Sequence, residues 1–195
     1  MPASPALIRS APSEHPQLSL SGGSLGNTSA DFTVTSSGGT FFAGNHVVIF
    51  PAHSICDPQT STYGDGQWDE PCSPLKGNID VHAEVRSDAL GRVWVDFTPA
   101  LRFVPSDNPS RWVWMIMYTP AAIGATGDLS AFNILYARSI GGETIDESAI
   151  DATMRTYVDT RIGLSMRRAK HFSGFMTSSG RACDPAIDSD CTAVP

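Results

Sequence analysis

The segment NIDVHAEVRS at residues 78–87 decides the fold, because apolar and polar side chains alternate along it without a break. The apolar positions are Ile79, Val81, Ala83 and Val85. Side chains at every second residue of a β-strand share one face, so this alternation is the signature of a half-buried strand. We therefore expect His82, at one of the polar positions, to point to solvent.

The stretches on either side continue a pattern of short strands separated by Gly, Pro and polar turns. RVWVDF at residues 92–97 alternates in the same way and predicts a hairpin with residues 78–87. Gly38 and Gly39 predict a further turn. More strands are expected in residues 31–37, 40–51, 101–105, 111–118, 132–140 and 163–179, the last as a hairpin or a bent strand. The sequence therefore predicts an all-β chain folded as an antiparallel β-sandwich.

The segment ETIDESAIDATMRTYVDTRIG at residues 143–163 is where a helix competes with a strand. Its apolar residues are loosely spaced on a helical face, as in a short amphipathic helix. Near its end the residues also alternate, with Met154 and Val158 opposed to Tyr157. We favour the strand, because the surrounding sequence is rich in strands.

Length and composition give the domain organisation. The chain has 195 residues, of which 41% are hydrophobic, and this leaves room for one core. Residues 1–30 are rich in Pro, Ser and Gly and predict an extended N-terminal arm, either disordered or laid along a partner. The sandwich is expected over residues 31–177, followed by a short C-terminal tail over residues 178–195.

Charge and hydropathy exclude two classes of partner contact. The net charge is −7, and the 13 basic residues are scattered apart from a group at 167–170, which argues against a nucleic-acid partner. Since no run reaches the roughly 18 apolar residues of a spanning helix, we expect no transmembrane span. The first residues, MPASPALIRSAPSEHP, lack the basic start and apolar core of a secretory signal. If the chain is exported, we favour a trimmed precursor or an upstream start.

The four cysteines fall into two local pairs, Cys56 with Cys72 and Cys183 with Cys191. Four cysteines allow three connectivities, and the two local bridges close the smallest loops. A four-thiolate zinc site is the competing interpretation, although CxxC spacing is absent. A second alternative is four free thiols in a cytosolic chain. We favour two disulfides and an extracytoplasmic location, where such bonds persist.

No local motif of a catalytic, cofactor or metal site is present, so we expect no enzyme activity, no cofactor and no metal. The five histidines are isolated in the sequence. His171, in HFSGF, is the most notable, and we favour a structural residue satisfied by a backbone carbonyl over a functional site. The acidic residues between Cys56 and Cys72 offer oxygens to calcium, but the EF-hand pattern is missing and a solvated loop is favoured.

The better candidates for an interface are four aromatic residues: Tyr63, Trp68, Trp112 and Trp114. Tyr and Trp are enriched at binding hot spots, because they combine a large apolar surface with one polar group. Trp112 and Trp114 share one face of the strand expected at 111–118, and its other face is apolar too. Either both faces are buried within the sandwich, which we favour, or one face docks against another molecule.

Three stretches occur in an order and spacing that point to a family: GGTFFAGNHVVIFPAHSI at 38–55, VDFTPALRFVP at 95–105 and KHFSGFMTSSG at 170–180. Together they resemble the landmarks of a ZU-five-type domain, the β-sandwich module of ankyrins and netrin receptors, with relatives in exported bacterial proteins. The resemblance covers about residues 31–177. The segment from Cys56 to Cys72 looks like an insertion into that pattern.

The resemblance implies a binding or scaffolding role without catalysis. We expect a membrane-extrinsic subunit whose partners are other protein subunits of a larger envelope or membrane-associated complex, in the periplasm or at the outer surface. One form implied by the bacterial relatives is a subunit of a photosynthetic reaction-centre or light-harvesting complex. The alternative is a carbohydrate-binding or adhesion module at the cell surface, using Trp68 and nearby carboxylates.

Overall fold

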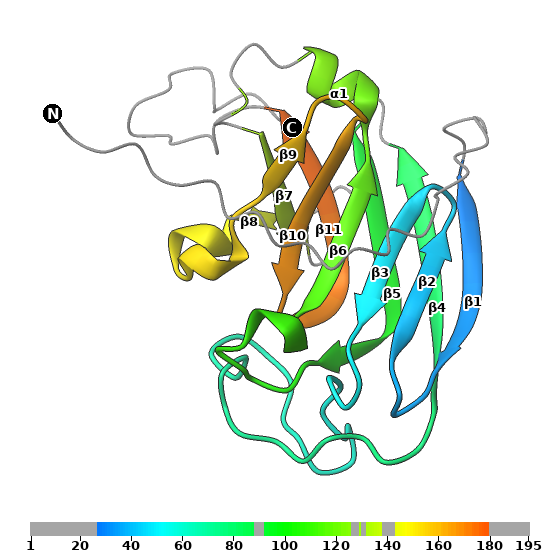
Figure 1. The fold of residues 1–195 in the computed structure, drawn as a ribbon, viewed down its shortest axis with the longest axis vertical. Helices are drawn as coiled ribbons and strands as arrows, with labels where there is room; N and C mark the ends of the chain where they lie inside the picture. Colours follow the sequence, from blue (N-terminus) through cyan, green and yellow to red (C-terminus); the bar gives the residue numbers. More distant parts are fainter. Residues whose placement is uncertain (1–26, 88–91, 126–128, 130–131, 138–142, 180–195) are drawn as a thin grey trace, which may run out of the picture.

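The computed structural model describes residues 27–87, 92–125, 129, 132–137 and 143–179. These residues form two antiparallel sheets that pack face to face, as Figure 1 shows, and the predicted all-β sandwich is confirmed. The six-stranded sheet has the order β1 (Thr28–Val34), β4 (Ile79–Ser87), β5 (Val93–Arg102), β11 (His171–Ser179), β7 (Phe132–Ala137) and β8 (Thr144–Ile145). The five-stranded sheet has the order β2 (Gly39–Ala43), β3 (His46–Phe50), β6 (Val113–Tyr118), β10 (Leu164–Ala169) and β9 (Tyr157–Asp159).

Short helices lie in the connections between strands. They are the 3-10 helices η1 (Pro109–Arg111), η3 (Glu147–Ala149) and η4 (Ala152–Met154) and the α-helix α1 (Pro120–Ala125). Within the described residues, no helix has the length and apolar character that crossing a membrane requires.

The alternation along 78–87 sets the orientation of β4. Val81, Ala83 and Val85 are buried in the core, whereas the His82 side chain is 48% exposed and lies 2.7 Å from the Asp31 carboxylate. β4 pairs antiparallel with β5, with Val85 opposite Val95, as the predicted hairpin requires. The residues expected to form its turn, 89–91, lie outside the described part of the chain.

The core lies between the inward faces of the two sheets and is rich in phenylalanine. Phe172 of β11 stacks on Phe97 with a centroid separation of 4.1 Å. The rings of Phe50 and Phe103 meet Phe172 edge-on at 5.4 and 4.8 Å. Burying each such side chain stabilises the fold by roughly 1.5–3 kcal/mol. This cluster ties strands of both sheets together.

The predicted turn at Gly38 and Gly39 carries the chain from β1 in one sheet to β2 in the other. Gly38 has φ of +73°, a left-handed conformation that glycine adopts without steric cost. A Cβ atom at this position would lie only 2.1 Å from the Phe50 carbonyl oxygen. Only glycine therefore fits this crossing.

Residues 163–179 form a bent strand and not a hairpin. β10 belongs to the five-stranded sheet and β11 to the six-stranded sheet, and Lys170 is the single residue between them. The register of β11 against β5 shifts between Phe172 and Gly174, as at a β-bulge. The bend places Lys170 and His171 at one end of the sandwich, where the candidate site lies.

Residues 143–163 correct both expectations for that segment. They form neither one helix nor one continuous strand, but the two-residue strand β8, two single 3-10 turns and the three-residue strand β9. The side chains of Asp146 and Asp151 cap these turns, accepting hydrogen bonds from the backbone N–H of Ser148 and Thr153. Asp side chains compete for backbone donors in this way, which favours caps and turns over strands.

The strands extend slightly beyond the interval expected for the sandwich. β1 begins at Thr28 and β11 ends at Ser179. The expected arm up to residue 26 and the expected tail from residue 180 lie outside the described residues.

Candidate functional site

Residues 57–71, which we call the tethered loop, are closed at their base by the predicted disulfide between Cys56 and Cys72. No free cysteine is found in the described ranges. The second predicted pair, Cys183 and Cys191, lies outside them. Closing a loop of this length stabilises the fold by roughly 3 kcal/mol in the chain-entropy model.

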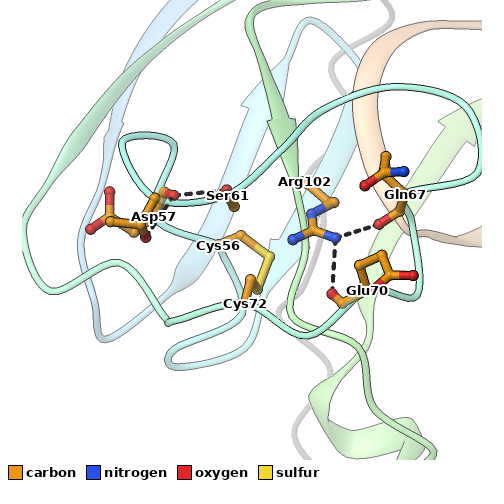
Figure 2. The surroundings of a disulfide bond; sticks show 8 residues. Cys56, Asp57, Ser61, Gln67, Glu70, Cys72 and Arg102 are labelled. Atoms are coloured by element: carbon orange, nitrogen blue, oxygen red, sulfur yellow. Dashed lines mark hydrogen bonds between the residues drawn. A yellow bond between two sulfur atoms is a disulfide. The ribbon is translucent and has the colours of Figure 1, made fainter.

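Arg102, at the end of β5, anchors the middle of the tethered loop. Its side chain is buried, and Nη1 donates hydrogen bonds to the backbone carbonyls of Gln67 and Glu70, the latter over 2.9 Å (Figure 2). A buried guanidinium needs acceptors, because an unsatisfied buried charge is costly. The loop carbonyls supply them and fix the loop against the sandwich.

Lys170 makes the next attachment, between the tethered loop and the 3-10 helices. Its Nζ lies 2.7 Å from a carboxylate oxygen of Asp69 in the loop and 2.7 Å from one of Asp151 before η4. Burial by itself would raise the pKa of Asp151, but hydrogen bonds from Lys170 and Thr153 outweigh it and hold this pKa at about 2. Asp151 is therefore ionised at neutral pH and pairs with the Lys170 ammonium.

Two predicted interface residues, Tyr63 and Trp68, attach the tethered loop to the sandwich. The Trp68 indole stacks on the His171 ring with a centroid separation of 3.8 Å and an interplanar angle of 17°. The Tyr63 hydroxyl donates to the backbone carbonyl of Phe172. The Tyr63 and Trp68 rings meet at 70° and so form no flat platform. Part of the surface of each ring therefore contacts other residues of this chain.

Beneath Trp68 lies a buried polar network of Glu147, Arg167 and His171. One carboxylate oxygen of Glu147 is 2.7 Å from His171 Nε2, and the other is 2.6 Å from Arg167 Nη2. Arg167 also donates to the Ile134 carbonyl over 2.7 Å. His171 Nδ1 has no partner among the described residues. The three side chains come from η3, β10 and β11, which meet only in the folded chain.

The network fixes the ionisation of Glu147. Burial would raise its pKa, but the hydrogen bond and charge of His171 and the charge and hydrogen bond of Arg167 lower the pKa below its ordinary value. An ionised carboxylate only accepts hydrogen bonds, so Nε2 of His171 carries the hydrogen. The partner of His171 Nε2 is therefore a carboxylate, where a backbone carbonyl was expected. Within this network the side chains of Arg167 and His171 are shut off from solvent.

A cavity of about 320 Å³ opens between the tethered loop and the segment that holds η3 and η4. Trp68 and Asp69 line it from the loop, and Ile150, Asp151 and Met154 line it from the other side. In Figure 1 the loop lies at the lower end of the sandwich and the two 3-10 helices stand at its side. We call this cavity the loop pocket.

The second notable feature is a row of apolar side chains across the outward face of the five-stranded sheet. In-register pairing places one residue of each strand in this outer row: Phe42, Val47, Ile116, Met166 and Tyr157. The alternate residues on these strands, such as Met115 and Val48, face the core. Phe42 and Tyr157, at the two ends, are 50% and 47% exposed, whereas Ile116 and Met166 are partly buried and Val47 is buried.

The remaining predicted interface residues, Trp112 and Trp114, lie beside the outer row. Their rings are 5.9 Å apart, and the Arg168 guanidinium sits 4.4 Å from the centre of the Trp112 ring. Both rings are only partly buried, whereas Val113 and Met115 on the other face are buried in the core. The preferred expectation, burial of both faces within the sandwich, is therefore wrong. The outward face of β6 is only partly covered.

Sequence reasoning missed Glu147, Arg167 and Lys170 as a connected group. A signal was present in MRRAKH, where basic residues occupy successive positions of a strand expected to be half-buried. In a period-two pattern, adjacent charges place at least one on the core side, where it must be paired. The pattern points to a buried ion pair but does not name the acidic partner.

Across residues 27–87, 92–125 and 143–179, no three His, Cys, Asp or Glu side chains gather closely enough to hold a metal ion. Comparison with protein-family models, with curated proteins and with solved structures gave no match. The ZU-five-type resemblance stays a prediction.

Proposed function

We propose that this chain is a non-catalytic interaction subunit that binds a partner protein through the outer row. The observation that carries the proposal is the row itself, in which all five strands contribute an apolar residue at the same level of an outward sheet face. An antiparallel sheet that faces water on one side ordinarily places polar residues there. Contiguous apolar surface on the outside of a protein marks a contact site.

The chemistry of the outer row favours a protein surface as its partner. The row contains no charged side chain, so it complements an apolar surface and not a phosphate backbone. Trp114 and Tyr157, whose ring centroids lie 6.4 Å apart, add aromatic area of the kind that dominates binding energy at interfaces. The strands hold these side chains on a rigid frame, so little conformational entropy is lost on docking.

The location proposed for this contact is outside the cytoplasm, as part of a larger envelope or membrane-associated complex. The Cys56–Cys72 disulfide supports an oxidising compartment. A membrane-extrinsic subunit of a bacterial photosynthetic reaction-centre or light-harvesting complex is one specific form of this proposal. That form rests on the ZU-five-type resemblance alone.

The experiment is affinity isolation of the tagged chain from its native membranes in mild detergent, followed by mass spectrometry. The row variant combines Phe42→Ser with Tyr157→Ser, and the matched control combines His82→Ser with Arg86→Ser on the outward face of the other sheet. We expect partner subunits in fixed stoichiometry with the unaltered chain and the control, and their loss with the row variant. Isolation of the chain alone, or identical partners with the row variant, contradicts the proposal. Light scattering of the purified chain shows whether a second copy occupies the row.

The loop pocket favours a second candidate function, a carbohydrate-binding or adhesion module. Its Trp68 wall stands beside the carboxylates of Asp69 and Asp151, a combination that also serves sugar recognition. The 70° angle between the Tyr63 and Trp68 rings counts against a flat platform for a polysaccharide. Retention of the protein on a glycan array, lost on Trp68→Ala, would favour this alternative over the subunit role.

A further inference from the structure

The loop pocket has the size and the walls of a ligand site. Its volume of about 320 Å³ falls at the lower end of the roughly 300–1,000 Å³ that small-molecule sites occupy. Its apolar walls come from Trp68, Tyr136, Ile145, Ile150 and Met154. Ile150 is 85% exposed and stands at the mouth, which extends the apolar wall to the surface. The space therefore suits one aromatic ring or a short aliphatic chain.

The walls are held open by contacts that do not depend on a ligand. Lys170 ties Asp69 of the tethered loop to Asp151, so the two sides of the pocket are joined by one ammonium group. Trp68 is held in place by its stack on His171, and Arg102 fixes the loop backbone next to it. A preformed site of this kind loses little free energy to ordering when it binds.

The charges around the loop pocket select the sign of the ligand. Four carboxylates line it, from Asp65, Asp69, Glu147 and Asp151, against the single ammonium of Lys170. Asp69 and Asp151 already share that ammonium, Asp151 also lies 4.0 Å from the Arg168 guanidinium, and Glu147 is paired with Arg167, so these three carboxylates are held in position. An anion would enter a region where carboxylates outnumber the cation that lines it. A cation would instead be attracted by the larger number of carboxylates.

Aromatic walls strengthen the preference for a cation. The faces of Trp and Tyr rings attract an ammonium or guanidinium group within about 6 Å of the ring centre. Trp68 and Tyr136 both line the loop pocket. An amine that carries an apolar body can place the body between the side chains of Ile145 and Met154 and its charge toward the carboxylates.

We propose that the loop pocket binds an organic cation, an amine or guanidine attached to an apolar stem. A free amine and a lysine or arginine side chain of another protein offer the same chemistry. The site uses residues other than those of the outer row, so it is independent of the proposed docking function.

The test is titration of the ¹⁵N-labelled full chain at pH 7 with three probes of similar shape: benzylammonium, benzyl alcohol and benzoate. The indole N–H signal of Trp68, identified by its absence in Trp68→Phe, reports binding. We expect benzylammonium to bind with a Kd of roughly 1 mM, the affinity that a ligand of this size commonly reaches. We expect benzyl alcohol to bind at least about tenfold more weakly, and benzoate to give no shift at comparable concentration.

Two variants and a control locate the site. Ile150→Arg places a tethered cation at an exposed position of the mouth, so it should abolish benzylammonium binding without unfolding the chain. Asp151→Asn should weaken binding by at least about fivefold through the loss of a nearby charge. Asp159→Asn removes a carboxylate that is paired with Arg161 away from the pocket, and it should leave binding unchanged.

A second pair of probes distinguishes the two sources of the cation. Acetyl-Gly-Lys-Gly-amide and its norleucine analogue differ only in the side-chain ammonium. Binding of the lysine peptide together with benzylammonium assigns the site to protein side chains, and binding of benzylammonium alone assigns it to free amines. Three results would overturn the proposal. They are benzyl alcohol binding as tightly as benzylammonium, Trp68 signal shifts that are the same in Ile150→Arg as in the unaltered chain, and no shift with benzylammonium up to roughly 20 mM.

Discussion

The tethered-loop end and the outward face of the five-stranded sheet use the same kinds of residue in opposite ways. At the loop end, the aromatic rings of Tyr63 and Trp68 pack on His171 and its neighbour, and the charged groups pair with one another. On the sheet face, Phe42 and Tyr157 stay about half exposed, with no charged side chain in their row. The rings at the loop end thus pack largely against this chain, whereas Phe42 and Tyr157 on the sheet face keep about half of their surface exposed.

The contrast teaches that only the part of an aromatic ring that the fold leaves uncovered is a candidate for binding, which for Trp68 is the part that lines the loop pocket. Trp68 and Trp114 are indistinguishable by residue type, yet the ring of Trp68 is stacked on a buried histidine, whereas Trp114 is only partly buried and lies near the half-exposed Tyr157. Substitutions at the loop end should therefore lower stability. Substitutions in the outer row should lower binding and leave stability nearly unchanged.

The largest stability effect is expected for Glu147→Gln. This variant leaves the Arg167 guanidinium buried without its carboxylate, and breaking a buried pair by removing one partner costs about 3–5 kcal/mol. Urea unfolding followed by circular dichroism measures the loss. The control is Glu84→Gln, whose partner Arg86 is exposed, and it should change the free energy of unfolding by about 1 kcal/mol or less. Similar losses for the two variants would contradict the structural role of the network.

Removal of the disulfide should have the next largest effect. The double variant Cys56→Ser, Cys72→Ser frees the tethered loop in the unfolded chain and should lower the free energy of unfolding by about 3 kcal/mol. Its folded state should retain the stack of Trp68 on His171, because Arg102 and Lys170 also hold the loop. Denaturant titration gives the loss of stability, and the Trp68 indole signal reports the stack. An unchanged free energy of unfolding together with loss of the Trp68–His171 stack would contradict this prediction, because the disulfide would then order the loop without stabilising the fold.

The five-stranded sheet should destabilise as the pH falls, through His46. Burial lowers the pKa of His46 from 6.5 to about 4, and its Nδ1 accepts a hydrogen bond from the backbone N–H of Tyr118. Between pH 6.5 and 4 His46 takes up a proton in the unfolded chain but stays neutral in the folded chain. The free energy of unfolding is therefore highest above pH 6.5 and decreases as the pH falls below it. The full loss is about 3 kcal/mol, reached near pH 4.

The pH effect can be assigned with His46→Asn, which keeps an acceptor near the position of Nδ1 but does not titrate. The difference in unfolding free energy between the unaltered chain and this variant should change only between pH 6.5 and 4. The depressed pKa of Asp151 adds a separate loss, which begins below about pH 4 as that carboxylate takes up its proton. If this difference in unfolding free energy does not change between pH 6.5 and 4, His46 is not the cause of the loss of stability.

The smallest stability effect is expected for the row variant, Phe42→Ser with Tyr157→Ser. Each side chain is about half exposed, so the loss should amount to about 1 kcal/mol or less. Thermal unfolding measures it on the same protein used for the partner isolation. A loss as large as that of Glu147→Gln would show that the row supports the fold, and the distinction between the two regions would disappear.

The strands were predictable where one strong local pattern governs them. Alternation along residues 78–87 gave both the strand β4 and the exposed position of His82, because neighbouring side chains in an extended chain point to opposite faces. The disulfide between Cys56 and Cys72 was also predictable, since its partners are close in sequence. The prediction for residues 143–163 failed because Asp146 and Asp151 cap single turns there. The spacing of apolar residues does not reveal such caps.

The sites were less predictable than the strands. The sequence named Trp112 and Trp114 as contact candidates but favoured their burial, because it gives no means of telling which face of an apolar strand meets the second sheet. The loop pocket depends on Ile145 and Trp68, which lie far apart in the chain and line one cavity only in the folded protein.

The sequence by itself determined the properties that act over a few residues: the strands with alternating faces, the glycine that turns the chain at position 38, and the closure of the tethered loop. Tertiary structure alone decided the pairing of Glu147 with Arg167 and His171, the alignment of one apolar residue from each strand into the outer row, and the hollow beside Trp68. The physical reason is the sequence distance over which each interaction acts. The geometry of a strand repeats every two residues and so depends on neighbouring residues, whereas the pairing of distant strands and the meeting of their side chains depend on burying apolar surface across the whole fold.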